Sequence, residues 1–425
     1  MHGMTVFDDL VGQEPVVAQL RSAAKAARLA LAAIGGAAGA GTGRPSGPGG
    51  PSGPGGWDER GGGMTHAWLF TGPPGSGRSV AARAFAAALE CREPEPGCGH
   101  CADCHTALQG THADIEVVRP AGLSYSVRET RELVLRAATS PSGGRWRIVL
   151  FEDADRATEQ AANALLKAVE EPAARTVWLL CAPSPDDLPV TIRSRCRLVT
   201  LRTPPADAVA DVLVRRDGID PDLAATASRA AQGHIGRARR LATDPEARRR
   251  RGDVLGVPGR LDGLGPSIEA AAALVAAAEA EAKATTEELN EGETAELRQA
   301  LGENAKGRMP RGTAGALKDL EDRQKSRATR VKRDALDRAL LDLASYYRDV
   351  LAVQFGAAVD LVNAERGPEL RAKAAAATPE ETLRRLEAIM LCRERLEANV
   401  NPLLAVEAMA LGLWSAPAAT PRRPR

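Results

Sequence analysis

Residues 72–79 read Gly-Pro-Pro-Gly-Ser-Gly-Arg-Ser and constrain the fold more than any other stretch of the chain. They have the form of a phosphate-binding loop, G-x-x-x-x-G-K-[S/T], except that Arg78 stands where the pattern has lysine. A short apolar run at 67–71 precedes the loop, and a helical pattern at 80–90 follows it. Strand, glycine-rich turn and helix together predict an anion-binding pocket, because free N–H groups at a helix N-terminus attract negative charge. The residues expected to form this pocket are Gly72, Gly75, Gly77, Arg78 and Ser79.

The remainder of the first half alternates between apolar runs and helical patterns. Further strands are predicted at 114–118, 147–151, 177–181 and 197–201. Such alternation is typical of a parallel sheet with helices on both faces. The sequence therefore predicts an α/β core with a five-stranded parallel sheet.

Acidic residues follow the predicted strand at 147–151, where an α/β sheet binds ligands. A working ATPase of this type carries Asp-Glu there, one acid organising Mg²⁺ and the other polarising water. Here the order is Glu152-Asp153. The acid expected to polarise water is therefore Asp153, whose side chain is one methylene shorter than that of glutamate. Ala182 occupies the position expected to sense the γ-phosphate, and its methyl group cannot donate a hydrogen bond. Together with Arg78, these changes oppose ATP hydrolysis. The loop glycines and the Ser79 hydroxyl are retained, so weak binding of ATP or ADP stays a prediction.

Four cysteines follow in Cys-x6-Cys-x2-Cys-x2-Cys spacing, which suits one tetrahedral Zn²⁺ ion. Disulfides and an iron–sulfur cluster are the alternatives. A reducing cytoplasm argues against disulfides, and an ATPase-like core gives no reason for redox chemistry. Four protein ligands leave no open position, so the zinc is expected to be structural. The ligands are Cys91, Cys98, Cys101 and Cys104, whereas Cys181, Cys196 and Cys392 are expected to be ordinary buried cysteines.

Composition changes along the chain predict its domains. Residues 35–63 are rich in Gly, Pro and Ser, which predicts a disordered insertion. Pro204-Pro205 marks the end of the first domain, and Ala/Glu/Lys/Arg-rich helices with a loop at 302–315 dominate the second half. The expected domains are 1–203 (α/β core, with the cysteine knuckle at 91–104), 204–245 (small helical lid), 246–415 (all-helical domain) and 416–425 (tail).

The net charge of +1 gives no broad basic field, so a stand-alone DNA binder is disfavoured. No apolar run has the length of a membrane span, and we expect a cytoplasmic protein without a membrane partner.

Several motifs together resemble those of bacterial clamp-loader AAA+ proteins. In order they are the Gln13 region, the phosphate loop, the Cys-x2-Cys-x2-Cys knuckle, Asn163-Ala-Leu-Leu-Lys-x-x-Glu-Glu-Pro172 and Ser194-Arg-Cys196. The resemblance covers roughly residues 4–245, and the motifs are highly specific in combination. Within the family the pattern is most similar to the delta-prime subunits of the DNA polymerase III clamp loader. The resemblance implies an AAA+ core, a lid and a C-terminal helical collar for oligomerisation.

This resemblance also implies a function. It suggests a non-motor, or stator, subunit of the DNA polymerase III holoenzyme, partnered with gamma/tau motor subunits and a delta subunit in a hetero-pentamer. That assembly loads the sliding clamp onto primed DNA at the replisome on the nucleoid. Arg195 would then be an arginine finger that reaches the γ-phosphate of ATP on a neighbouring motor subunit. Arg237 matches the family's lid arginine, which touches a bound nucleotide.

Two other functions compete with this interpretation. The first is an ATP-hydrolysing motor subunit similar to gamma/tau, which Arg78, Asp153 and Ala182 disfavour. The second is a stand-alone zinc-bearing nucleic-acid adaptor, which the near-neutral charge and the complete ATPase-like core disfavour.

Overall fold

The computed structural model describes residues 5–37, 63–143, 145–301 and 313–414. Most of the predicted insertion at 35–63 and the predicted tail at 416–425 lie outside these residues, although the helix that precedes the insertion continues to Ala37. The chain separates into two compact units. The first runs to Arg239 without Ala121–Leu123, and the second contains Ala121–Leu123 and the chain from Arg240 onward.

The first unit is built on a five-stranded sheet in which every strand pair is parallel. The strand order is β2-β3-β4-β1-β5, so β1 lies between β4 and β5. This confirms the predicted parallel sheet. The strands are β1 (Ala67–Thr71), β2 (Ile115–Val118), β3 (Arg147–Phe151), β4 (Thr176–Ala182) and β5 (Arg197–Thr200).

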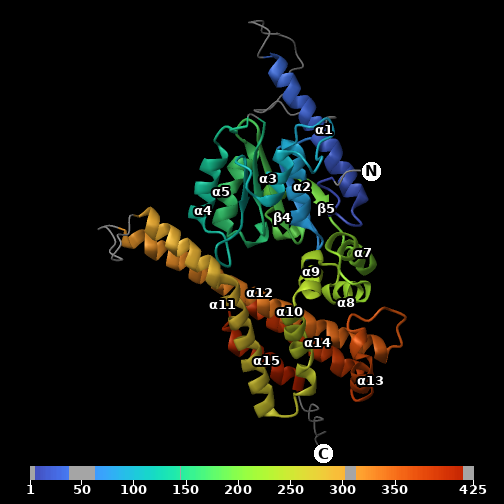
Figure 1. Ribbon diagram of the computed structural model, residues 1–425. Coiled ribbons are helices and arrows are strands. Elements are labelled where there is room, and N and C mark those ends of the chain that lie inside the picture. Colours follow the sequence, from blue (N-terminus) through green and yellow to red (C-terminus); the bar gives the residue numbers. More distant parts are fainter. Residues whose placement is uncertain (1–4, 38–62, 144, 302–312, 415–425) are drawn as a thin grey trace, which may run out of the picture. The chain divides into compact units, whose positions relative to one another are not determined.

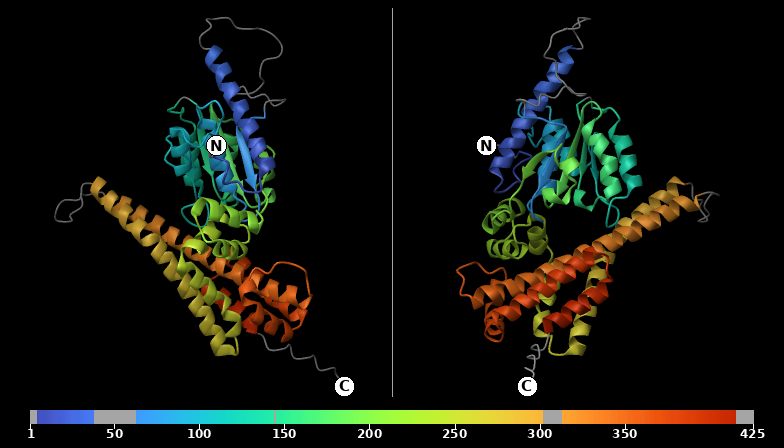
Figure 2. Two further views of the ribbon diagram at one scale, coloured as in Figure 1. Left: turned by 45° about the vertical axis from the view of Figure 1, so that its right-hand side comes forward. Right: turned by 180° about the vertical axis from the view of Figure 1, so that it is seen from behind.

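Side chains alternate between the two faces of this sheet and form two apolar cores. Trp68 and Phe70 of β1 point into one core, whereas Leu69 points into the other. Helices α1, α2 and α3 cover the first face, and α4 and α5 cover the second (Figures 1 and 2). Their bounds are α1 (Glu14–Ala37), α2 (Arg78–Glu90), α3 (Ala102–Gln109), α4 (Val127–Ala137) and α5 (Glu159–Glu170).

The small helices that follow the sheet pack onto the same unit. Gln13 donates from Nε2 to the carbonyl of Arg202 (2.5 Å) and accepts from the Arg202 N–H (3.2 Å). Arg216 forms an ion pair with Asp9. The boundary between the two compact units falls after Arg239, inside α9, whereas the lid domain is predicted to end at 245. The helices are α7 (Ala206–Asp217), α8 (Pro221–Ala231) and α9 (Ile235–Thr243).

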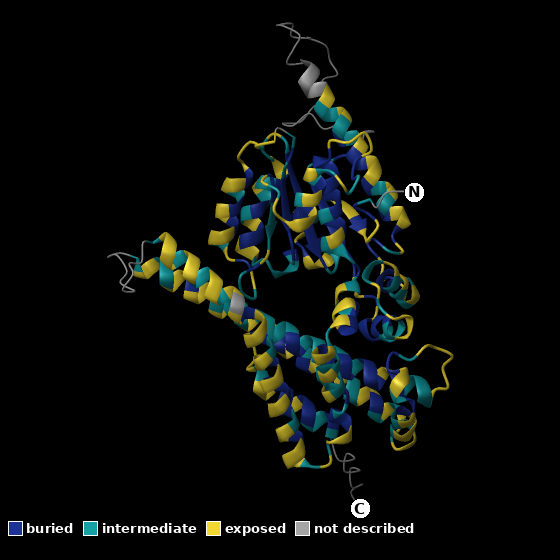
Figure 3. Ribbon diagram, in the orientation of Figure 1, coloured by how far each residue is buried: buried dark blue, intermediate teal, exposed yellow. Residues whose placement is uncertain are grey.

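All the secondary structure described in the second unit is helical, as predicted. Its core is formed by buried side chains of the five longer helices and α13 (Figure 3). Residues 378–413 have a helical spacing of apolar residues but form two helices, because Asn399 adopts a left-handed conformation and Pro402 starts a new helix. None of the described helices is both long and apolar enough to cross a membrane. The helices are α10 (Pro245–Leu255), α11 (Leu264–Ala300), α12 (Ala314–Gln354), α13 (Gly367–Ala375), α14 (Pro379–Glu397) and α15 (Pro402–Trp414).

The join between sheet and lid depends on the absence of a side chain at Gly233. A Cβ atom there would lie 2.3 Å from Thr203 Cγ2 and 2.8 Å from the Pro204 carbonyl oxygen, and φ is +86°. We expect Gly233→Ala to lower the free energy of unfolding by about 2 kcal/mol or more, since left-handed strain adds to the steric overlap. Gly218→Ala is the matched control, because Gly218 is also left-handed but nothing lies within 4 Å of its Cβ position. Equal losses of stability in urea unfolding would contradict the close approach at Gly233.

Candidate functional site

The phosphate loop joins β1 to α2, which begins at Arg78. The Arg78 guanidinium turns back and donates from Nη1 to the Gly72 carbonyl at 2.5 Å. The Gly72 N–H donates to the Pro183 carbonyl at 3.1 Å, just beyond the end of β4. The cationic side chain of the loop is therefore engaged by the loop's own backbone, and a phosphate would have to compete for it.

The start of α9 lies against the middle of this loop. A Cβ atom at Gly75 would lie 2.6 Å from His234 Cβ and 2.8 Å from His234 Cα. The Arg237 N–H caps the same turn by donating to His234 Nδ1 at 3.2 Å. The structure thus brings the half-buried Arg237 onto the helical turn that approaches the loop, where the resemblance predicted a lid arginine.

Glu152 is buried and ion-paired at the end of β3. Arg119 donates from Nε to one carboxylate oxygen at 2.5 Å and from Nη2 to the other at 3.2 Å. Arg83 Nη2 lies 3.6 Å from Oε1. The hydrogen bonds from Arg119 also raise the pKa of that guanidinium. Both oxygens predicted to help hold Mg²⁺ are therefore already engaged by arginine.

The remaining predicted pocket residues lie near Glu152 at the same edge of the sheet. Asp153 adopts a left-handed conformation (φ 50°) before a short 3₁₀ turn, and burial raises the pKa of Asp155 within that turn. Ser79 is half-buried in the first turn of α2. Ala182 is the buried last residue of β4, and not the first residue beyond the strand as predicted. Its methyl group packs into the core on the α4–α5 face, so it offers no donor to the pocket.

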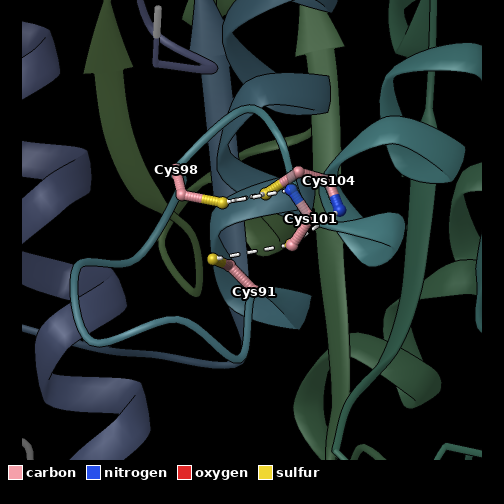
Figure 4. A group of neighbouring side chains, drawn as sticks. All are labelled: Cys91, Cys98, Cys101 and Cys104. Atoms are coloured by element: carbon pink, nitrogen blue, oxygen red, sulfur yellow. Dashed lines mark hydrogen bonds between the residues drawn. The ribbon is translucent and has the colours of Figure 1, made fainter. Parts of the chain in front are cut away.

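The four predicted zinc ligands come together beside the C-terminal end of α2 (Figure 4). Their sulfur atoms all lie within 4.8 Å of one another. Cys98 Sγ and Cys104 Sγ are 4.0 Å apart, and Cys101 Sγ and Cys91 Sγ are 3.9 Å apart. A tetrahedral ion with Zn–S bonds of about 2.3 Å requires S···S separations of roughly 3.8 Å. All seven cysteines are free thiols, so the cluster has the dimensions of a metal site and not of disulfides.

Backbone N–H groups point at these sulfurs and favour thiolates. Cys101 N–H donates to Cys98 Sγ (3.3 Å), and Cys104 N–H donates to Cys101 Sγ (3.4 Å). Burial opposes ionisation of Cys91, but hydrogen bonds from surrounding backbone N–H groups leave the pKa of its thiol below the usual value, whereas burial raises the pKa values of the Cys101 and Cys104 thiols. The donor set fits zinc, which these four residues would hold with no open position. Elsewhere, Cys181 and Cys392 are buried as predicted, whereas Cys196 is only half-buried.

Arg195 lies at the opposite edge of the sheet from the phosphate loop. In the β1–β5 register Arg197 pairs with Trp68, at the amino ends of both strands, and Thr200 pairs with Thr71, where the loop begins. At about 3.3 Å per residue, the loop lies roughly 13 Å from the Trp68–Arg197 pair along the strand direction, and Arg195 precedes that pair in sequence. The guanidinium donates to the Thr191 carbonyl at 2.8 Å and pairs with Glu170 at 2.6 Å. The structure therefore places Arg195 away from this chain's own pocket.

The sequence model of the family described as "DNA polymerase III, delta subunit" matches residues 59–205, roughly a third of the chain. That region holds the whole sheet, the loop, the cysteine cluster and Arg195. Residues 59–205 are therefore similar to the clamp-loader subunits of DNA polymerase III. The resemblance stated from the motifs is confirmed.

Individual relatives agree with this assignment. The chain is 39% identical over 166 residues to DNA polymerase III subunit delta' of Pseudomonas aeruginosa, covering 37% of this chain and 50% of that protein. It is 34% identical over 177 residues to the Escherichia coli subunit delta', covering 41% and 53%. The chain therefore matches about half the length of these relatives.

Gamma/tau subunits are also similar to this chain. That of Mycobacterium tuberculosis is 34% identical over 157 residues, covering 36% of this chain and 27% of the relative. Among solved structures, a gamma subunit-related protein from Thermotoga maritima aligns with 81% of this chain and 93% of its own, at 16% identity and a TM-score of 0.39.

The motif analysis missed three contacts in this part of the chain. Arg119 could have been found from the β2–β3 register, since Val118 pairs with Phe151 and the next two residues are Arg119 and Glu152. The local sequence pattern does not predict, however, that β2 pairs with β3. The contacts of His234 with Gly75 and of Glu170 with Arg195 join separate motifs, and no local pattern signals them.

The cysteine cluster predicts one zinc ion per chain in protein purified without chelator. Cys101→Ser should lose the metal and lower the melting temperature, because metal binding contributes to the folding of the knuckle. Cys392→Ser is the control, since that buried thiol lies in the second unit and should leave the zinc content unchanged. Elemental analysis of both variants tests this, and a metal-free wild-type protein would contradict it.

Proposed function

We propose that this chain is a delta-prime-type, non-motor subunit of the DNA polymerase III clamp loader. In this role it supplies Arg195 to the ATP site of a neighbouring motor subunit. The observation that carries the proposal is the position of Arg195, which is held at the edge of the sheet opposite to this chain's own phosphate loop. An arginine that cannot reach its own pocket is suited to complete another subunit's site.

The chain's own pocket supports a non-motor role. Arg78 is engaged by the Gly72 carbonyl, and Glu152 is paired with Arg119 and Arg83. Lysine at the loop position would be a compact point charge on a flexible stem, whereas arginine is bulky and planar. Hydrolysis also requires a carboxylate free to bind metal or to orient water, and Glu152 is not free. The loop retains its scaffold, and weak binding of ATP or ADP in a non-hydrolysed form is compatible with this proposal.

An arginine supplied in trans has a defined chemical task. Phosphoryl transfer spreads negative charge over the phosphate oxygens, and a guanidinium stabilises that charge through paired N–H donors. Such a finger contributes about 10³- to 10⁵-fold to the rate at its site. A guanidinium is charged without help from neighbouring groups, so an arginine finger needs no activation.

In the assembly that this function implies, gamma/tau motors and a delta subunit join this chain in a hetero-pentamer. The assembly places a sliding clamp on primed DNA in the cytoplasm, at the replisome. The zinc knuckle would act structurally, since it ends α2 and packs into the core that also supports β1. Arg237 would contact a nucleotide only if one enters this chain's own pocket.

A motor subunit is the second candidate, and the similarity to gamma/tau proteins favours it. The two functions differ in whether this chain hydrolyses ATP by itself.

We expect the purified chain to hydrolyse ATP no faster than a blank without protein. Arg78→Lys alone should not restore turnover, because the Arg119–Glu152 pair and Ala182 remain. A steady-state phosphate-release assay measures both proteins. Robust turnover by the wild-type chain would favour the motor subunit over the stator.

Arg195→Ala should leave this chain folded and able to assemble, but should abolish hydrolysis at the site it completes in a reconstituted loader. The expected loss of the hydrolysis rate at that site is about 10³-fold or more. The total turnover of the loader should therefore fall by the fraction that this one site contributes. Arg193→Ala is the matched control, since Arg193 lies on the same turn and pairs only with Asp186 among the described residues. Unchanged turnover with Arg195→Ala, in a loader of normal composition, would remove the finger assignment.

A further inference from the structure

We propose that Glu170 is a positioning residue for the arginine finger, which fixes the plane of the Arg195 guanidinium before a partner's phosphate arrives. This inference rests on the proposed function and adds to it a second residue, contributed by the same chain. Glu170 is the last residue of α5, and Arg195 follows the short helix α6 (Val190–Arg193). Two of the motifs that carry the family resemblance therefore meet in one ion pair.

Three contacts hold the guanidinium at the surface. Nη2 lies 2.6 Å from Glu170 Oε1, and Nη1 donates to the Thr191 carbonyl at 2.8 Å. Nη1 also lies 3.3 Å from Ser194 Oγ. Because a guanidinium carries five N–H groups, these contacts fix its orientation and still leave donors for phosphate oxygens.

The backbone on either side of Arg195 is anchored. Ile192 is buried, and Cys196 packs against the same core, which also contains Leu165 and Val169 of α5. The Arg195 N–H donates to the Ile192 carbonyl at 3.0 Å. One core therefore positions both α5, which carries Glu170, and the turn that carries Arg195.

The position of Glu170 is unfavourable for α5 considered alone. A carboxylate in the last turn of a helix faces the negative end of the helix dipole. Arg195 offsets this charge. Both side chains are more than one-third exposed, so the pair adds little to stability. Its effect is on geometry, because a finger held in one orientation loses less freedom when it meets the transition state.

The test uses the reconstituted loader with its motor and delta subunits. Glu170→Ala should lower kcat at the site that Arg195 completes by about two- to fivefold, with KM for ATP unchanged. Glu170→Gln, which keeps a hydrogen-bond acceptor without the charge, should lose less. Glu171→Ala is the matched control, because this neighbouring exposed carboxylate forms no ion pair within the described part of the chain. Its turnover should equal that of the wild type.

A double variant separates positioning from a general structural effect. Glu170→Ala combined with Arg195→Ala should be no worse than Arg195→Ala alone, because Glu170 acts only through the finger. A further loss in the double variant, or normal kcat in Glu170→Ala beside a defective Arg195→Ala, would overturn the inference and leave the proposed function standing. Normal turnover in Arg195→Ala would instead overturn the proposed function.

Discussion

The parallel pairing of β1 with β4 and β5 is the constraint on which the rest of the first unit depends. β1 is a fully buried interior strand between β4 and β5, and its carboxyl end leads directly into the phosphate loop. Because all the strands run the same way, their carboxyl ends meet at one edge and their amino ends at the other. The loop, Glu152 and Ala182 consequently gather at one edge, whereas Arg195 and Glu170 gather at the other. The separation between the phosphate loop and Arg195 follows directly from strand direction.

Arginine side chains occupy the contacts that a working ATPase would leave available to lysine, magnesium and phosphate. Arg78 donates to the loop's own carbonyl, and Arg119 with Arg83 neutralises Glu152. These contacts are charge-assisted and within one chain, so they form without any ligand. The pocket has kept its backbone shape while its polar groups satisfy one another. Such a pocket can support a rigid core without taking part in hydrolysis.

Much of the first unit was predictable because its signals are local. The alternation of apolar runs and the cysteine spacing each depend on residues close together in sequence. The predicted strand bounds agree with the structure within a residue or two, and the four cysteines form one cluster. The errors came from places where distant parts of the chain meet. Ala182 became part of β4 because Thr71 pairs with it. The division into two compact units falls inside α9, whose first turn lies against the phosphate loop. The interruption at Asn399 depends on one left-handed residue, which a helical apolar pattern does not reveal.

By itself, the sequence determined the presence of a phosphate loop with arginine in place of lysine, four cysteines spaced to hold a metal ion, and an arginine in a Ser-Arg-Cys motif. These are short-range patterns, and their chemistry follows from residue type and spacing. Only the tertiary structure decided what each charged side chain touches. The sheet brings Arg119 to Glu152 and the lid brings His234 to the loop, while the shared core brings Glu170 to Arg195. Ion pairs between residues far apart in sequence are set by strand order and packing, so the partner of each predicted functional residue became known only when the chain was folded.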